Sequence, residues 1–283
     1  MIKSNNKGRF KRAHQQKKNM GAIITAKNVT KKFKVVAAVD NISFEVQEGE
    51  VFAFLGPNGA GKTTTIRMLT TLLHPTSGDI HINGYNVQEE QAKVRSSFGI
   101  VFQDPSLDNE LTAYENMEFH GVLYHVPKEI RKARVEYLLK FVGLWERKDS
   151  PVKTFSGGMK RRLEIARGLI HHPRILFLDE PTLGLDPQTR NHMWEYIKKL
   201  NKEEKMTVFF TTHYMKEAET IANTIAIIDQ GKIIMKDTPS RLKKATKTKT
   251  VEEAFLKLTG HSIREEAGTI KDRMRITART WRM

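Results

Sequence analysis

One segment constrains this chain more than any other: Gly56-Pro57-Asn58-Gly59-Ala60-Gly61-Lys62-Thr63. It fits the pattern glycine, any four residues, glycine, lysine and then serine or threonine. The continuous apolar run Val51–Leu55 precedes it, and apolar residues at helical spacing follow it up to Leu73. In a strand, loop and helix of this order, successive backbone N–H groups point inward at phosphate oxygens, and the helix dipole adds positive potential. The sequence therefore predicts an α/β fold with a phosphate-binding loop.

Three side chains of this segment carry specific predictions. Lys62 would bridge the β- and γ-phosphates of a nucleotide and take part in catalysis, and the Thr63 hydroxyl would be a ligand of Mg²⁺. Thr64, the next residue, is assigned to nucleotide binding together with the rest of the loop. The alternative is an ordinary glycine-rich turn. It is disfavoured because the flanking strand and helix, the lysine and the hydroxyl are all present.

Two adjacent carboxylates, Asp179 and Glu180, end the wholly apolar strand Ile175–Asp179, which we expect at the centre of the sheet. Ligands of open α/β sheets bind at the carboxyl ends of the strands. Asp179 is placed to hold Mg²⁺ through water, and Glu180 can face the attacking water as its base or orienter. The alternative is that Asp-Glu-Pro is only the turn that leaves the strand. The phosphate loop in the same chain favours the metal interpretation.

Strands and helices alternate along the chain, as in α/β folds. Further strands are expected at Ile23–Ala26, Ile42–Val46, Phe98–Phe102, Thr207–Thr211 and Thr224–Asp229. Helices are expected from the capping box Thr112 to Glu115, at Lys128 to Val142, from Ser156 to about Ile170, from Asp186-Pro187 to about Leu200, from Thr238-Pro239, and from a second capping box, Thr250 to Glu253, up to Gly260. No core pattern is visible beyond Gly260.

A further motif, Phe155-Ser156-Gly157-Gly158-Met159, opens a helix 23 residues before Asp179. Its hydroxyl and free N–H groups could bind a γ-phosphate, although a serine followed by glycines is by itself more often only a helix cap. With the phosphate loop and the paired carboxylates, this arrangement resembles the nucleotide-binding subunit of ATP-binding cassette (ABC) transporters, from about residue 23 to residue 240. Phe155, Met159 and Leu183-Gly184-Leu185-Asp186 resemble its daunorubicin-resistance-type branch of drug or lipid exporters.

The resemblance implies roles for four more residues. Phe33 would stack on adenine, and the alternative is a core aromatic at a strand edge. Gln103 would act in catalysis and reach Mg²⁺ as the Q-loop glutamine, and the turn after it would face a membrane subunit. Asp186 would lie at a dimer contact, and it can cap the next helix at the same time. His213 would contact the γ-phosphate as the switch histidine.

The same resemblance implies a composite site. Met159 stands where the signature of the family usually has glutamine. A thioether cannot supply the hydrogen bonds of an amide, so Ser156 and the backbone of Gly157 and Gly158 would carry the contact. The chain has one phosphate loop and one signature, so by the rule of the family two copies form a head-to-tail homodimer. Each ATP would lie between the loop of one copy and Ser156–Gly158 of the other.

The fold implied by the resemblance is a P-loop NTPase with a RecA-like core, an N-terminal antiparallel β subdomain and an α-helical subdomain insertion at about 104–170. The chain would divide into a basic, disordered lead 1–21, an ABC ATPase domain 22–245, and a C-terminal helix with a basic tail 246–283. The implied function is an ATP-binding and hydrolysing subunit that uses ATP and Mg²⁺. It would work with a separate integral membrane permease at the cytoplasmic face of the cell membrane and power export of a drug, antibiotic or lipid-like substrate.

Composition and charge bear on the alternatives. The net charge of +16 is concentrated at the ends: residues 1–19 carry seven basic side chains and no acidic ones, and residues 241–283 carry 12 basic against 5 acidic. The nearly neutral body disfavours specific nucleic-acid binding. The absence of Cys excludes thiolate metal sites, and no apolar run reaches the ~18–20 residues that span a bilayer.

A cassette ATPase of translation or nucleic-acid repair is the alternative function, and only the basic ends of the chain favour it. Glu180 and His213 together oppose a regulatory module that binds ATP without hydrolysis.

Overall fold

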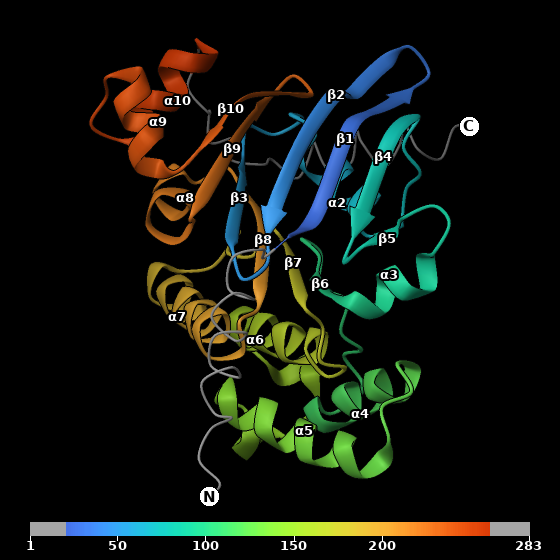
Figure 1. Cartoon of the computed structure of the whole chain (residues 1–283). Helices are drawn as coiled ribbons and strands as arrows, with labels where there is room; N and C mark the ends of the chain where they lie inside the picture. Colours follow the sequence, from blue (N-terminus) through green and yellow to red (C-terminus); the bar gives the residue numbers. More distant parts are fainter. Residues whose placement is uncertain (1–20, 261–283) are drawn as a thin grey trace, which may run out of the picture.

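The computed structural model describes residues 21–260, so the predicted basic lead up to residue 20 and the tail 261–283 lie outside the described residues. The described part contains two sheets (Figure 1). The larger has the strand order β10-β9-β3-β8-β7-β6, and the smaller has the order β2-β1-β4-β5. The strands are β1 (Ala22–Phe33), β2 (Val36–Gln47), β3 (Val51–Leu55), β4 (Ser77–Ile82), β5 (Tyr85–Asn86), β6 (Phe98–Val101), β7 (Ile175–Asp179), β8 (Thr207–Thr212), β9 (Thr224–Asp229) and β10 (Lys232–Asp237).

Helices cover both faces of the larger sheet (Figure 1). They are α2 (Lys62–Leu69), α3 (Gln91–Ser97), α4 (Ala113–Leu123), α5 (Lys128–Phe141), α6 (Gly157–Gly168), α7 (Pro187–Glu204), α8 (Met215–Ile221), α9 (Pro239–Thr246) and α10 (Val251–Thr259). Helices α4 and α5 form a separate layer at the bottom of Figure 1, and with α6 they fall within the predicted insertion 104–170. Among residues 21–260, no helix is long and apolar enough to cross a membrane.

Strands β3, β6, β7, β8 and β9 run parallel to one another. The predicted strands Val51–Leu55 and Ile175–Asp179 are β3 and β7. The prediction that Ile175–Asp179 lies at the centre of the sheet is wrong: β7 pairs with β8 on one side and with the edge strand β6 on the other, while β3 and β8 occupy the centre. A wholly apolar strand shows that both of its faces are covered, and this does not fix its place in the strand order.

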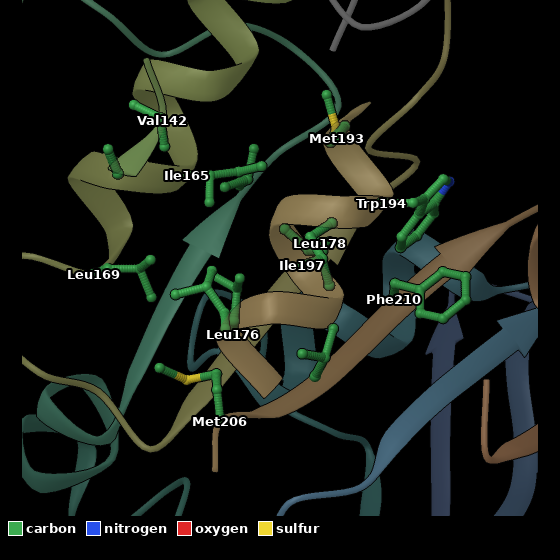
Figure 2. Packing of buried hydrophobic residues seen from close by; sticks show 14 of the residues in the cluster. Val142, Ile165, Leu169, Leu176, Leu178, Met193, Trp194, Ile197, Met206 and Phe210 are labelled. Carbon is green, nitrogen blue, oxygen red and sulfur yellow. The ribbon is translucent and has the colours of Figure 1, made fainter. Parts of the chain in front are cut away.

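Each buried strand divides its side chains between two cores, because successive residues of a strand point to opposite faces of the sheet. In β3, Phe52 and Phe54 pack with α2 and the smaller sheet, whereas Leu55 packs in the core with helices α4 to α8. Figure 2 shows part of this second core, where Trp194 of α7 meets Phe210 of β8 edge-on with ring centroids 4.8 Å apart. Both faces of the sheet are therefore sealed, and its carboxyl edge is left for polar side chains.

The two N-terminal strands are longer than predicted. Strands β1 and β2 pair as an antiparallel hairpin, and β1 also pairs with β4. The apolar alternation at Ile23–Ala26 and Ile42–Val46 falls within the part of the hairpin that packs on the core. Towards the hairpin tip, strand pairing continues to Phe33 and Val36, but these side chains are exposed. Burial ends before pairing does, so the sequence pattern underestimates the strands.

The two predicted capping boxes have different outcomes. At the start of α4 the box is complete: the Thr112 hydroxyl accepts from the Glu115 amide, and the Glu115 carboxylate accepts from the Thr112 amide. At the start of α10 only half of it forms. The Thr250 hydroxyl accepts from the Glu253 amide, but the Glu253 carboxylate accepts from the amide of Lys249. The chain before Thr250 offers a second free N–H group, and the carboxylate takes that one.

Two helix ends differ from the prediction. Helix α2 ends at Leu69 instead of Leu73, where Thr71 adopts left-handed backbone with φ 63°. Helix α7 continues to Glu204, and Lys205 ends it with φ 55°. Neither residue is glycine or proline, so the sequence carries no conventional stop signal at these positions.

Strand β6 and helix α6 approach each other closely at two glycines. A Cβ atom on Gly99 would lie 2.1 Å from the Gly168 carbonyl oxygen. A Cβ atom on Gly168 would meet nothing nearer than 3.6 Å, which is ordinary contact. Direct packing of backbone on backbone at Gly99 therefore sets the distance between α6 and the strand that leads to Gln103.

We expect Gly99→Ala to lower the free energy of unfolding by about 2 kcal/mol, because backbone must move to admit the methyl group. Gly168→Ala, on the other side of the same contact, is the matched control. It should leave the free energy of unfolding unchanged or raise it by up to about 1 kcal/mol, since alanine is the better helix former. Chemical denaturation of both variants measures the difference, and equal stability of the two would contradict the packing argument.

Candidate functional site

The predicted phosphate loop joins the end of β3 to the start of α2, whose first residue is Lys62. Gly61, directly before the helix, has φ 103°. A Cβ atom on Gly61 would lie 2.5 Å from the Ala38 carbonyl oxygen, so the position requires glycine for both conformation and space. The amides of the first turn of α2 have no partner within the helix. They are therefore available to an anion held by the loop.

Lys62 is buried at the mouth of this loop. Its Nζ donates to the carbonyl oxygens of Gly56 at 2.8 Å and Pro57 at 3.1 Å. The same atom forms an ion pair with Glu180 Oε1 at 3.0 Å. The ammonium group thus links the loop after β3 to Glu180, the residue that follows β7.

Two threonine hydroxyls hold Asp179. Its Oδ1 accepts from Thr211 Oγ1 at 2.6 Å and from Thr63 Oγ1 at 3.3 Å. Burial raises the pKa of Asp179 above its ordinary value, although the two hydroxyls and Lys62 act in the opposite direction. A cation beside Asp179 would offset the free-energy cost of burying its charge.

Glu180 is fixed through its backbone and through its carboxylate. It has left-handed backbone with φ 47°, which is costly for a residue other than glycine. Its amide donates to Thr211 Oγ1 at 3.0 Å, and its Oε2 accepts from His213 Nδ1 at 2.9 Å. Burial acts to raise the pKa of Glu180, but His213 and Lys62 together outweigh burial and hold the pKa below its ordinary value. Glu180 is therefore an ionised carboxylate held in one orientation.

Thr63 and Asp179 supply the oxygen atoms that Mg²⁺ prefers. Their hydroxyl and carboxylate oxygens lie 3.3 Å apart, close enough for both to approach one ion. Residues 21–260 contain no group of three or more His, Cys, Asp or Glu side chains that could hold a metal ion. The hydroxyl of Thr63 and the carboxylate of Asp179 fit an Mg²⁺ ion by the chemistry of their oxygen atoms.

Two predicted residues lie outside this cluster. Gln103 follows β6 at an exposed position, and within the described chain no hydrogen bond joins it to Thr63 or Asp179. Phe33 ends β1 with 48% of its surface exposed, and Lys31 Nζ lies 5.3 Å from the centre of its ring. The alternative that Phe33 is a core aromatic is therefore wrong. Its ring is accessible to a planar group from solvent.

The signature residues form a second cluster with Asp186. Ser156 caps α6, its Oγ accepting at 3.3 Å from the amide three residues later. Asp186 caps α7 by accepting from the Thr189 amide at 3.0 Å. The two helix starts are in contact, because a Cβ atom on Gly158 would lie 2.4 Å from Thr189 Cγ2. Within residues 21–260, no hydrogen bond or ion pair joins Ser156 or its two glycines to the phosphate loop.

Thr211 and Glu217 are part of the site but were not among the predicted site residues. The Thr211 hydroxyl donates to the Asp179 carboxylate and accepts from the backbone amide of Glu180, as described above. Glu217, buried on α8, accepts from the hydroxyls of Thr182 at 2.6 Å and Thr212 at 3.2 Å, and burial raises its pKa. It connects the segment after β7 to the last residue of β8. A pair of threonines at the end of an apolar strand was the signal available in the sequence.

The sequence profile of the ABC transporter family matches residues 39–183. The chain belongs to this family. The linearmycin resistance ATP-binding protein of Bacillus subtilis is 46% identical to it over 212 residues, which are 75% of this chain and 68% of the relative. A daunorubicin resistance ATP-binding protein of Streptomyces coeruleorubidus is 40% identical over 223 residues, 79% of this chain and 70% of the relative.

A solved structure is similar to this chain over most of its length. It is the dimeric, post-hydrolysis state of an ATP-binding cassette bound to ADP and inorganic phosphate, 31% identical, with a TM-score of 0.69 over 76% of this chain and 98% of the other. The predicted family, exporter branch and P-loop NTPase fold are confirmed. The chain is an ATP-binding subunit and ATPase of the ABC type, homologous to drug-resistance exporter ATPases. The alternative in translation or nucleic-acid repair is not favoured.

Proposed function

We propose that this ABC subunit powers export of a drug, antibiotic or lipid-like molecule through a separate membrane permease at the cytoplasmic face of the membrane. The convergence of Lys62, Asp179, Glu180 and His213 at the carboxyl edge of the larger sheet carries the proposal, because these groups can bind and hydrolyse a nucleoside triphosphate. The names of the relatives, resistance proteins for linearmycin and daunorubicin, support the class of substrate.

Lys62 binds the β- and γ-phosphates and releases Glu180 as it does so. A phosphate and Glu180 compete for the same ammonium group, which lies 3.0 Å from Glu180 Oε1. Phosphate binding therefore removes from Glu180 one of the groups that lower its pKa. The pKa of Glu180 then rises, and the carboxylate becomes a stronger base when the substrate is in place.

Glu180 accepts a proton from the attacking water, and His213 joins this carboxylate to the γ-phosphate. Because His213 Nδ1 donates to Glu180 at 2.9 Å, Nε2 is the ring nitrogen left for a phosphate oxygen. His213 would therefore lie between the Glu180 carboxylate and the γ-phosphate.

Thr63 and Asp179 would hold an Mg²⁺ ion, with Gln103 as a further ligand from the segment after β6. When bound, the ion would neutralise charge on the phosphates. The loop residues from Gly56 to Thr64 surround the phosphates, and the accessible ring of Phe33 stacks on adenine. The raised pKa of Asp179 supports its role, because a carboxylate that is costly to bury as an anion gains most from a neighbouring cation.

Two substitutions separate nucleotide binding from hydrolysis. Lys62→Ala removes the fixed charge that faces the phosphates, and we expect ATP affinity to fall by at least about 100-fold. Glu180→Gln removes the base and the competitor for Lys62, so ATP affinity should be kept or increased while turnover falls by at least about 100-fold. Nucleotide titration and phosphate release measure the two effects. Normal hydrolysis by Glu180→Gln would place the base elsewhere.

The signature cluster completes the nucleotide site of a second copy of the chain. Ser156, Gly157 and Asp186 are exposed at the starts of α6 and α7. The Ser156 oxygen accepts from its own helix, so its O–H proton remains available to a phosphate oxygen. The dimeric cassette described above supports this arrangement. A head-to-tail homodimer therefore encloses ATP between the loop of one copy and Ser156–Gly158 of the other.

Mixing two inactive variants tests the homodimer. Ser156→Arg blocks the signature but leaves the loop intact, and Lys62→Ala does the reverse. In a mixed dimer, one site pairs the intact loop of the first chain with the intact signature of the second, so ATPase activity should recover on mixing to about a quarter of the wild-type rate or less. Phosphate release from the mixture measures it. Full activity of Ser156→Arg by itself would remove the signature from the site.

Helix α4 presents an apolar surface to which the permease binds. Phe119, Val122 and Leu123 are 61%, 49% and 57% exposed. Residues three and four positions apart lie on the same face of a helix, so the three side chains form one patch. An exposed apolar patch marks a contact surface. The patch belongs to the first helix after Gln103, and this places it on the part of the chain that follows the turn expected to face a membrane subunit.

Phe119→Ser combined with Leu123→Ser should reduce the amount of co-expressed permease that purifies with this subunit by at least about tenfold, because the apolar contact is lost. The ATPase activity of the isolated subunit should stay unchanged. Val35→Ser, at the exposed hairpin tip, is the control for loss of an exposed apolar side chain. Undiminished recovery of the permease with the double variant would contradict this docking surface.

A further inference from the structure

Arg161 of α6 is almost completely buried and takes no part in the contacts described so far. Its guanidinium uses all five of its N–H donors. Nε donates to the Pro181 carbonyl oxygen at 2.8 Å, Nη1 donates to the Phe102 carbonyl oxygen and to Glu164 Oε2 at 3.1 Å, and Nη2 donates to the carbonyl oxygens of Asp179 at 3.1 Å and Glu180 at 3.3 Å. Four of the five acceptors are therefore backbone groups.

These carbonyl groups belong to the two segments that carry the proposed catalytic residues. Phe102 directly precedes Gln103, and the other three carbonyls belong to consecutive residues where the chain leaves β7. Arg161 and Thr211 together fix both peptide groups that flank the Cα atom of Glu180. The left-handed backbone of Glu180, with φ 47°, persists only where surrounding contacts enforce it. Arg161 supplies two of these contacts.

Glu164 extends the network along the same face of α6. It is buried, and its Oε2 pairs with Arg161 while its Oε1 accepts from the Ser106 amide at 2.7 Å and the Ser106 hydroxyl at 3.3 Å. Arg167, one turn further on, donates to the Ser106 carbonyl oxygen at 2.7 Å. The turn after Gln103 is thereby connected through α6 to the backbone of Glu180.

We infer that Arg161 and Glu164 are a positioning pair for ATP hydrolysis. Arg161 holds the backbone of Glu180 so that its carboxylate faces the water, and Glu164 makes this geometry depend on the position of the turn at Ser106. The inference rests on the proposed role of Glu180 as the base. Neither member of the pair is a ligand of the nucleotide in this scheme. Both act through the backbone of Glu180.

The chemistry of the guanidinium distinguishes this role from simple anchoring of α6. A lysine keeps the charge of Arg161, but its three donors on one nitrogen cannot span four carbonyl groups. If the pair only anchors the helix, Arg161→Lys lowers stability and leaves the turnover of the folded protein unchanged. If the pair positions Glu180, turnover falls in protein that is folded and binds ATP normally.

Arg161→Lys is therefore the test variant, and Arg162→Lys is its matched control. Arg162, the next residue of α6, donates to the Val142 carbonyl oxygen at 2.8 Å, in the layer of α5 and not at β7. For Arg161→Lys we expect kcat to fall at least about tenfold with the ATP dissociation constant unchanged within about twofold. For Arg162→Lys we expect both to stay at the wild-type values. Thermal denaturation of each purified chain confirms that it is folded at the assay temperature.

A second measurement tests the coupling to Glu180. In the Glu180→Gln background, Arg161→Lys should cause no further loss of the single-turnover rate, because the orientation of an absent base no longer matters. Glu164→Gln keeps the shape of its side chain and serves if Arg161→Lys does not fold. It should also lower kcat while ATP affinity is unchanged.

Each other outcome has a defined meaning. Unchanged kcat in the folded test variant, an equal loss in Arg162→Lys, a loss of ATP affinity as large as the loss of kcat, or an additive loss in the Glu180→Gln background would overturn the positioning role. Normal hydrolysis by Glu180→Gln alone would instead refute the assignment of the base, and the inference would fall with it. The two failures are therefore distinguishable.

Discussion

Two adjacent carboxylates buried at the end of β7 are the constraint on which the rest of the site depends. Asp179 and Glu180 are each less than a tenth exposed, so each needs a partner to remain ionised. The partners come from separate parts of the chain: Lys62 and Thr63 begin α2, Thr211 lies one residue before the end of β8, and His213 follows that strand. The parallel order β3-β8-β7 brings these segments to one edge of the sheet. The site therefore requires this strand order, because the order brings the partners of the two buried carboxylates together.

The same surroundings give the two carboxylates different properties. Burial dominates at Asp179 and raises its pKa, whereas at Glu180 burial is outweighed by His213 and Lys62 together, and the pKa is lowered. Neighbouring carboxyl groups whose pKa values are moved apart can divide the work of a reaction between them. In the proposed mechanism Asp179 holds a cation and Glu180 accepts a proton. Asp179 is the last residue of the extended strand β7, and Glu180 has left-handed backbone. The two carboxylates therefore meet different neighbours although they are adjacent in the sequence.

The sequence predicted the elements around the site better than those at the margins, for physical reasons. Strands β3 and β7 are buried on both faces, and their apolar runs match the observed bounds. Strand β10 was not predicted, because its side chains are exposed or half-buried along its length. Arg161 could not be recognised either. It is the middle one of three consecutive basic residues, and only the rotation of α6 about its axis turns that one inward.

The contact between Gly158 and Thr189 joins the two helix starts that the proposed dimer would use. The first turns of α6 and α7 are in contact here, because Gly158 has no side chain and leaves space for the Thr189 methyl group. Asp186 begins the second of these helices, and Ser156 begins the first. A displacement of Asp186 would therefore act directly on the helix start that carries Ser156. In the proposed head-to-tail pair, this contact would connect the two nucleotide sites, because each copy would contribute a loop to one site and a signature to the other.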